Sequence, residues 1–451
     1  ILTGVDLTNA DLTGATLTDV VSGQIIGAPT LPAAYTMVDG YIVGPTVDLT
    51  DAIFTAADLA SSDLTDANLT SATLNNAVLT DAVLTGVDLT EADLTGATLT
   101  NVISGQILGT PTLPEAYSLI KGYVVGPGVV LTGADLTDSG EPDTGLPETG
   151  LAGFDLSNAN LSASVLTDAI LTGADLTSAN LTGATLTNVV SGQITGIPTL
   201  PSAYTMAKGY IVGPGVNLTN SDLTNAVLTG VDLTDADLTG ATLTNVVSGQ
   251  IIGIPTLPSN YTVINGYIVG PSVDLTDADL TGSDLSGLDL TDVVLTGATL
   301  NGVTSGSIIG TPLLSSSYSM INGYIFGPYV SLNGIDLTSF DMAGVDLAGA
   351  DLTGATLTAA NLSGDAYLYG ASLNGVASGL ITGAPALPPA YSMIKGYIVG
   401  PGVDLTDADL THANLSYLDL GSANLSGAKL GDTNMTGVDL RGADLRGANL
   451  T

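Results

Sequence analysis

A leucine that recurs every five residues constrains this chain more than any other feature. In VDLTDADLTGATLTN (231–245), Leu233, Leu238 and Leu243 are five residues apart, and a small apolar residue usually stands two positions before each leucine. On an α-helix five residues advance by about 500°, so the leucines would spiral around the helix. On a strand an odd spacing sends successive side chains to opposite faces. All leucines share one interior only if the backbone turns once in every five residues, and four such turns close a square coil.

This pattern resembles the pentapeptide-repeat family, whose motif is A-(D/N)-L-X-X. The closest matches to the motif are ADLTG (93–97), ANLTG (180–184) and ADLRG (443–447), and the pattern covers most of the chain outside its interruptions. The resemblance implies an all-β fold, a right-handed quadrilateral β-solenoid. We expect residues 1–451 to form a single continuous solenoid, since a regular internal repeat favours a body stabilised by contacts between neighbouring repeats.

Six inserts of similar sequence interrupt the repeat. Each begins S-G and ends in G-Y-(I/V)-(V/F)-G-P, and a two-residue X-Gly step separates two short apolar runs. At Asn265-Gly266 this step is the strongest two-residue hairpin signal, because a type I′ turn needs positive φ at both positions. The sequence therefore predicts six protruding β-hairpins that leave the coil and rejoin it. The inserts span 22–45, 104–127, 191–214, 248–271, 305–328 and 378–401.

The spacing of the inserts gives an expectation for their direction. The inserts that start at 191, 248 and 305 are 57 residues apart. If six pentads and two sides from the insert make eight sides, these hairpins lie along one edge. The inserts at 22 and 104 are 82 residues apart, which predicts a rotation by one side.

Two tyrosines in each insert are the candidate contact residues, because they would clamp the hairpin against the solenoid wall or against a neighbouring hairpin. They are Tyr35, Tyr41, Tyr117, Tyr123, Tyr204, Tyr210, Tyr261, Tyr267, Tyr318, Tyr324, Tyr391 and Tyr397.

A further irregular stretch, 138–153, is rich in glycine, proline and acidic residues and has no pentad phase. It contains LPETG (146–150), which resembles the motif that sortases cleave near the C-terminus of wall-anchored proteins. Here a long repeat region follows it, so an acidic loop of turn-forming residues is the preferred interpretation.

The charge balance narrows the possible partners. The chain has 44 acidic and six basic residues, a formal net charge of −38. Nucleic acid and anionic membranes need basic residues, so neither is an expected partner. No apolar run reaches the roughly 18 residues of a membrane helix, so membrane insertion is not expected either. Stacked rows of aspartate leave weak Ca²⁺ binding possible, although no Ca²⁺-loop motif occurs and loose screening by cations is the simpler account. No other cofactor is expected.

Catalysis has little chemical basis in this sequence. There is no cysteine, and the one histidine, His412, stands at an outward pentad position. No Ser-His-Asp or Cys-His set can form around it, and no carboxylate pair stands out among so many. We therefore expect a protein that is not an enzyme.

The leading functional hypothesis is a rigid acidic rod of an extracellular filament, appendage or surface layer. The partner would be the same protein, through hairpin contacts or end to end, since the repeat runs to both ends of the sequence. The alternative is a DNA mimic, because the resemblance includes acidic proteins that bind DNA gyrase; protruding hairpins would obstruct that duplex-like surface. Lesser alternatives are a viral fibre, a Ca²⁺-binding surface, and an ice-binding surface on threonine pairs such as Thr16 and Thr18.

Overall fold

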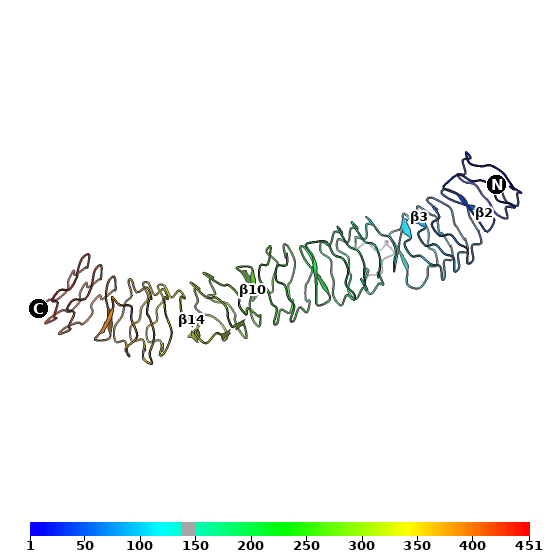
Figure 1. Ribbon diagram of the computed structural model, residues 1–451. Coiled ribbons are helices and arrows are strands. Elements are labelled where there is room, and N and C mark those ends of the chain that lie inside the picture. The colour runs from blue at the N-terminus through cyan, green and yellow to red at the C-terminus, as the bar shows by residue number, and fades with distance from the viewer. Residues whose placement is uncertain (138–149) are drawn as a thin grey trace. The chain divides into compact units, whose positions relative to one another are not determined.

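The computed structural model describes residues 1–137 and 150–451, which contain strands, bridges and turns but no helix. Two compact units are distinguished. Unit 1 comprises Ile1–Leu223, Val231–Thr242 and Ile252–Leu257, and unit 2 comprises Thr224–Gly230, Leu243–Ile251 and Pro258–Thr451. Within each unit the backbone winds in stacked coils (Figure 1). The predicted all-β solenoid is thus the observed fold class.

A regular coil takes 20 residues, or four pentads. Asp48 forms a parallel bridge with Asn68, and Asn68 forms the next with Asp88. Backbone hydrogen bonds join the layers, as from Leu49 N to the Asn68 carbonyl at 2.7 Å. The residue before each leucine therefore lies in a column of bridges that runs up one side of the stack.

Each corner is a tight turn with one residue in the left-handed region. Ala52 N donates to the Leu49 carbonyl at 3.0 Å, and Asp51, the third residue of that turn, has φ of 58°. Positive φ at this position defines a type II turn, which favours glycine or asparagine. Asp51 N also donates to Thr70 O of the next coil at 3.0 Å, so the stack holds even a non-glycine residue in this conformation.

The interior is filled by the leucine and by the small residue two positions before it. In unit 2, Leu332, Leu337, Met342 and Leu347 occupy the four sides of one coil, each with 0% exposure. Removing such side chains from water is the main favourable term in folding. The bridge residue between the two inward positions faces out, and there the sequence places mostly Asp, Asn or Thr.

Six antiparallel strand pairs fall within the six inserts. At the two-residue step both positions have positive φ, 50° at Asn265 and 78° at Gly266, as a type I′ turn requires. The pairs are β1 (Thr36–Val38) with β2 (Tyr41–Val43), β5 (Ser118–Ile120) with β6 (Tyr123–Val125), β7 (Thr205–Ala207) with β8 (Tyr210–Val212), β9 (Thr262–Ile264) with β10 (Tyr267–Val269), β13 (Ser319–Ile321) with β14 (Tyr324–Phe326), and β15 (Ser392–Ile394) with β16 (Tyr397–Val399).

These hairpins do not protrude, and that part of the expectation is wrong. Ile325 and Phe326 of β14 are both at 0% exposure, and the matching residues of the other five second strands are equally buried. Ile308 N donates to the Gly323 carbonyl at the hairpin tip at 3.1 Å, which ties the tip to the preceding coil. Each hairpin is wedged between coils, with its second strand in the core.

The sequence makes room for this strand by omitting leucines. Ser305 and Gly310 follow the bridge residues Thr304 and Ile309, in the place that leucine takes in a regular coil. Ser305 Oγ accepts a hydrogen bond from Ile325 N at 2.9 Å. The first serine of every insert makes the same bond to its own hairpin. The hydroxyl thus satisfies a buried backbone N–H that has no ladder partner.

The predicted alignment of inserts along one edge is also wrong. In unit 2 one insert begins after Val247, which is bridged to Asp274, and the next begins after Thr304, which is bridged to Asp284. Asp284 lies two pentads after Asp274, so these inserts start on opposite sides. An insert supplies three sides rather than two, and seven pentad sides rather than six separate consecutive inserts. A 57-residue unit therefore spans two and a half coils.

The inserts of unit 1 at 22 and 104 do start on adjacent sides, as expected. Val21 belongs to the column of Asn68, whereas Ile103 belongs to that of Asp63, one pentad earlier.

Two short parallel pairs complete the strands: β3 (Val83–Thr85) with β4 (Ile103–Gly105), and β11 (Val294–Leu295) with β12 (Leu313–Leu314). Of the predicted acidic loop 138–153, residues 138–149, with most of LPETG, lie outside the described residues; 150–153 form a turn.

Candidate functional site

The first tyrosine of each insert locks the start of the hairpin to its end. The Tyr261 hydroxyl donates to the Pro271 carbonyl at 2.9 Å, and a methyl group at Gly270 would overlap the Tyr261 ring. Tyr35, Tyr117, Tyr204 and Tyr391 make the same bond to their own proline. Burial, and then a nearby aspartate, raises the pKa of this hydroxyl in Tyr117, Tyr204, Tyr261 and Tyr391.

The second tyrosine joins the hairpin to the coils on both sides. The ring of Tyr267 lies against Gly249 of the preceding coil, where an added Cβ would be 3.0 Å from its Cε1. Its hydroxyl accepts a hydrogen bond from Asp279 N of the following coil at 3.1 Å. Tyr41, Tyr210 and Tyr397 accept the corresponding bond. Tyr123 and Tyr324 place their rings against Gly105 and Gly306 in the same way.

The twelve candidate tyrosines therefore bond chiefly within their own chain, and a contact with a neighbouring molecule stays a prediction. What remains open to such a neighbour is a groove beside the first tyrosine. At Tyr261 it has a volume of about 300 Å³ and is lined also by Gly287 and Asp289. At Tyr35 the equivalent groove measures about 290 Å³ and reaches Asp63.

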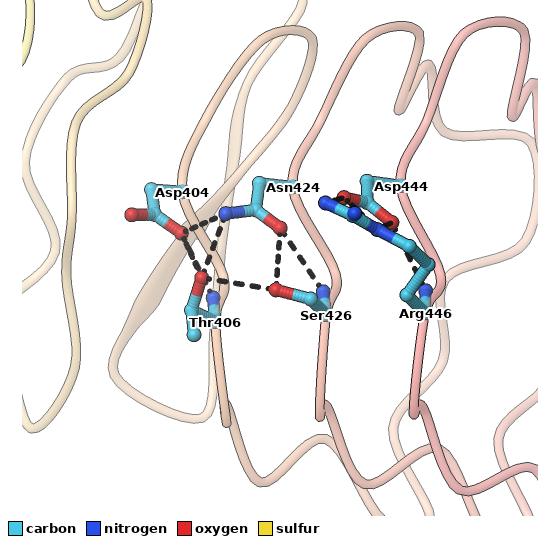
Figure 2. Close-up of polar contacts among 6 residues, drawn as sticks. All are labelled: Asp404, Thr406, Asn424, Ser426, Asp444 and Arg446. Atoms are coloured by element: carbon cyan, nitrogen blue, oxygen red, sulfur yellow. Dashed lines mark hydrogen bonds and ion pairs between the residues drawn. The ribbon is translucent and has the colours of Figure 1, made fainter.

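The aspartates of the repeat are held by the residues that follow the leucines. Figure 2 shows three stacked positions in unit 2. Thr406 donates to Asp404 Oδ1 through its backbone N–H at 3.0 Å and its hydroxyl at 2.5 Å. Asn424 Nδ2 of the next coil donates to Asp404 Oδ1 at 3.1 Å. In the third coil Arg446 Nε donates to Asp444 Oδ2 at 2.9 Å.

These bonds favour the charged carboxylate. The pKa of Asp279 lies below its ordinary value because the Thr281 hydroxyl, and then the Thr281 N–H, donate to it. Asp88, Asp93 and Asp175 show the same lowering of the pKa for the same reason. The Asp-Leu-Thr triplet thus fixes the carboxylate as an anion at neutral pH.

No residue group with catalytic or metal-binding geometry emerges in 1–137 and 150–451. Within those ranges no three His, Cys, Asp or Glu side chains are grouped to hold a metal ion. His412 is an exposed turn residue with φ of 60°, and its Nδ1 lies 3.4 Å from Asp432 Oδ2. No helix of these ranges is long and apolar enough to cross a bilayer.

Four exposed tyrosines outside the inserts did not figure among the candidates. They are Tyr329, Tyr367, Tyr369 and Tyr417, with exposed fractions of 58%, 42%, 53% and 79%. Tyr329 and Tyr417 occupy left-handed turn positions, with φ of 61° and 63°. An aromatic residue that replaces the usual turn residue of a pentad was the signal available in the sequence.

Bridge columns, type II corners and a leucine interior define a repeat protein of the β-solenoid class. The profile of the pentapeptide repeats matches eight copies, over residues 1–21, 47–70, 62–101, 155–190, 215–247, 274–304, 330–364, 401–427 and 419–451. The chain belongs to the pentapeptide-repeat family, and the match indicates no catalytic family.

Similar solved structures carry the same kind of repeat. HetL, a pentapeptide repeat protein involved in heterocyst differentiation regulation from the cyanobacterium Nostoc, is 23% identical, with 71% of this chain and 89% of HetL covered and a TM-score of 0.13. Trypsin-treated QnrB1, a plasmid-mediated fluoroquinolone resistance protein, is 12% identical, with coverage of 67% and 86% and a TM-score of 0.12. Rfr23 from the cyanobacterium Cyanothece is 19% identical, with coverage of 44% and 89% and a TM-score of 0.08. No curated protein matches the sequence.

Proposed function

We propose that this protein is a non-catalytic structural element of an extracellular filament, appendage or surface layer, in which copies associate with one another. In this proposal residues 1–451 form one continuous, right-handed solenoid. The observation that carries it is the use of the polar residues: carboxylates, threonines and insert tyrosines bond mainly to neighbouring coils of the same chain. Side chains committed in this way stiffen a body and leave few groups free for chemistry.

Self-association would use the grooves beside the first insert tyrosines, with their carboxylates screened by cations. Because the surface charge is strongly negative, association is expected only at moderate or high ionic strength. Sedimentation velocity at about 10 mM and about 500 mM salt tests this, followed by electron microscopy of native material. Filaments or lateral arrays that form in high salt support the proposal; a monomer at every salt and protein concentration contradicts it.

A DNA mimic that binds a DNA-processing enzyme such as gyrase is the second candidate. The net charge favours it, and the wedged hairpins favour it further, because the expected obstruction of the surface by protruding hairpins does not apply. A supercoiling assay with added protein separates the two proposals. Inhibition that a charge-matched acidic polymer does not reproduce would favour the mimic over the structural role.

A further inference from the structure

The four exposed tyrosines outside the inserts lie on one edge of unit 2. Gly302 N donates to Tyr329 O, Tyr329 N donates to Ala348 O, and Gly349 N donates to Tyr369 O, so these turns stack on one another. Tyr367 stacks on Tyr369, with ring centroids 6.1 Å apart and planes inclined by 30°.

Tyr417 belongs to the same edge. Asn414 is two pentads after Asp404, which is bridged to Ala377, and Tyr367 is two pentads before Ala377. In a four-sided coil two steps in either direction reach the same side. The turns that follow Tyr367 and Asn414 therefore lie on the same corner column.

The two tyrosines at turn positions are held in an unfavourable backbone conformation. A bulky residue with positive φ is a genuine outlier, and such outliers gather at functional positions. Each ring lies over the glycine of the next turn: a Cβ at Gly349 would be 2.5 Å from Tyr329 Cε1, and one at Gly437 would be 2.7 Å from Tyr417 Cδ1. With one ring face on the backbone, these tyrosines form outward platforms instead of filling the core.

The charge around the platforms has one sign over a long stretch. From residue 209 to residue 394 the chain contains no lysine or arginine. The columns on either side of the Gly349 turn hold Asp346 and Asp351. An exposed aromatic face beside carboxylates suits lysine and arginine, whose cations are attracted both to the ring and to the acid. The same charge disfavours a second copy of this acidic chain.

We propose that this edge, defined by Tyr329, Tyr367, Tyr369 and Tyr417, binds an extended basic segment of another protein. Lysine or arginine side chains lie over the exposed rings and pair with the flanking carboxylates. This surface is distinct from the grooves of the inserts and does not depend on self-association.

The test is a fluorescence anisotropy titration of the full chain with a labelled octa-arginine peptide at about 150 mM salt. The double variant Tyr329→Ala, Tyr369→Ala is expected to weaken binding about tenfold, since two cation–π contacts are lost. The control variant Ile309→Ala, Leu313→Ala removes exposed apolar side chains of the same unit, at 59% and 60% exposure, and is expected to change affinity less than twofold. Unchanged thermal melting of both variants verifies folding.

Two other results would overturn the proposal. Equal affinity of the tyrosine variant and the wild type would mean that the peptide binds by diffuse charge alone. Binding of a neutral soluble β-glucan that depends on the tyrosines, while peptide binding does not, would identify the edge as a sugar-binding surface.

Discussion

A regular coil and an insert coil of unit 2 fill the same cross-section in different ways. The coil that starts at Ser331 returns to its column at Asp351, after 20 residues, and leucine or methionine fills each side. The coil that starts at Thr304 returns at Ser331, after 27 residues, and carries Ser305 and Gly310 where leucines are expected. Its core is supplied by Ile325 and Phe326 from the hairpin.

The difference teaches that the repeat dictates a volume and a set of backbone partners rather than a fixed side chain. A leucine can be exchanged for a whole strand, provided that serine replaces the missing ladder partner and glycine allows the backbone to approach. The insert is therefore part of the wall, and the predictions below treat its residues as core residues.

The largest effect is expected for Gly310→Ala. A Cβ there would lie 2.5 Å from Thr291 Cα, and φ is +82°, so overpacking adds to backbone strain. We expect a loss of about 3–5 kcal/mol in the free energy of unfolding. Gly282→Ala is the matched control, with φ of +69° and open space around the new Cβ, and should lose about 1–2 kcal/mol. Chemical denaturation of both variants measures the difference; equal losses would refute the close approach.

A slightly smaller loss is expected for Ile325→Ala. Ile325 of the hairpin and Leu337 of the next coil are both at 0% exposure, so each truncation should cost about 2–5 kcal/mol. Denaturant midpoints of Ile325→Ala and Leu337→Ala provide the comparison. A loss below about 0.5 kcal/mol for Ile325→Ala alone would mean that the hairpin hangs outside the wall.

The serine that replaces leucine should contribute through its hydroxyl. In unit 1, Ser191 Oγ accepts from Ile211 N at 3.0 Å, so Ser191→Ala leaves a buried N–H unpaired and should cost about 1–3 kcal/mol. Ser221 is the control, because it is as buried but its Oγ has no hydrogen-bond partner among the described residues. Thermal melts should show Ser221→Ala neutral or stabilising; a loss equal to that of Ser191→Ala would contradict the assigned bond.

The smallest effect, and the one that depends on pH, is expected for Thr281→Val. The mutation removes the hydroxyl donor and should raise the pKa of Asp279 toward its ordinary value. Because the folded pKa is lowered, the bond stabilises the protein above the unfolded pKa, near pH 4, and this stability is lost as pH falls through the folded pKa. The variant should therefore be less stable at pH 7 and unchanged near pH 2.

The control for this prediction is Thr296→Val. Val294 takes the aspartate position before Thr296, so no carboxylate accepts from that hydroxyl. Carboxyl titration by NMR, with melts at the two pH values, distinguishes the variants. An Asp279 pKa that does not move would show that the hydroxyl does not set it.

The sequence by itself determined the coil. A five-residue period can bury Leu332, Leu337, Met342 and Leu347 together only if the chain turns after each, and this requirement holds before any contact is known. It also predicted the positive φ at Asn265 and Gly266, since the turn chemistry is local. Aspartate followed by threonine two residues later is likewise a local pair.

Tertiary structure alone decided where the hairpins lie, which sides the inserts begin on, and which tyrosines meet. The burial of Ile325 depends on the gaps at Ser305 and Gly310, and a gap in the interior is visible only when coils are stacked. The side on which an insert begins follows from how many sides the insert itself makes, a number that its composition does not encode. Tyr329 and Tyr417 are far apart in sequence, and only the four-sided winding brings them to one edge.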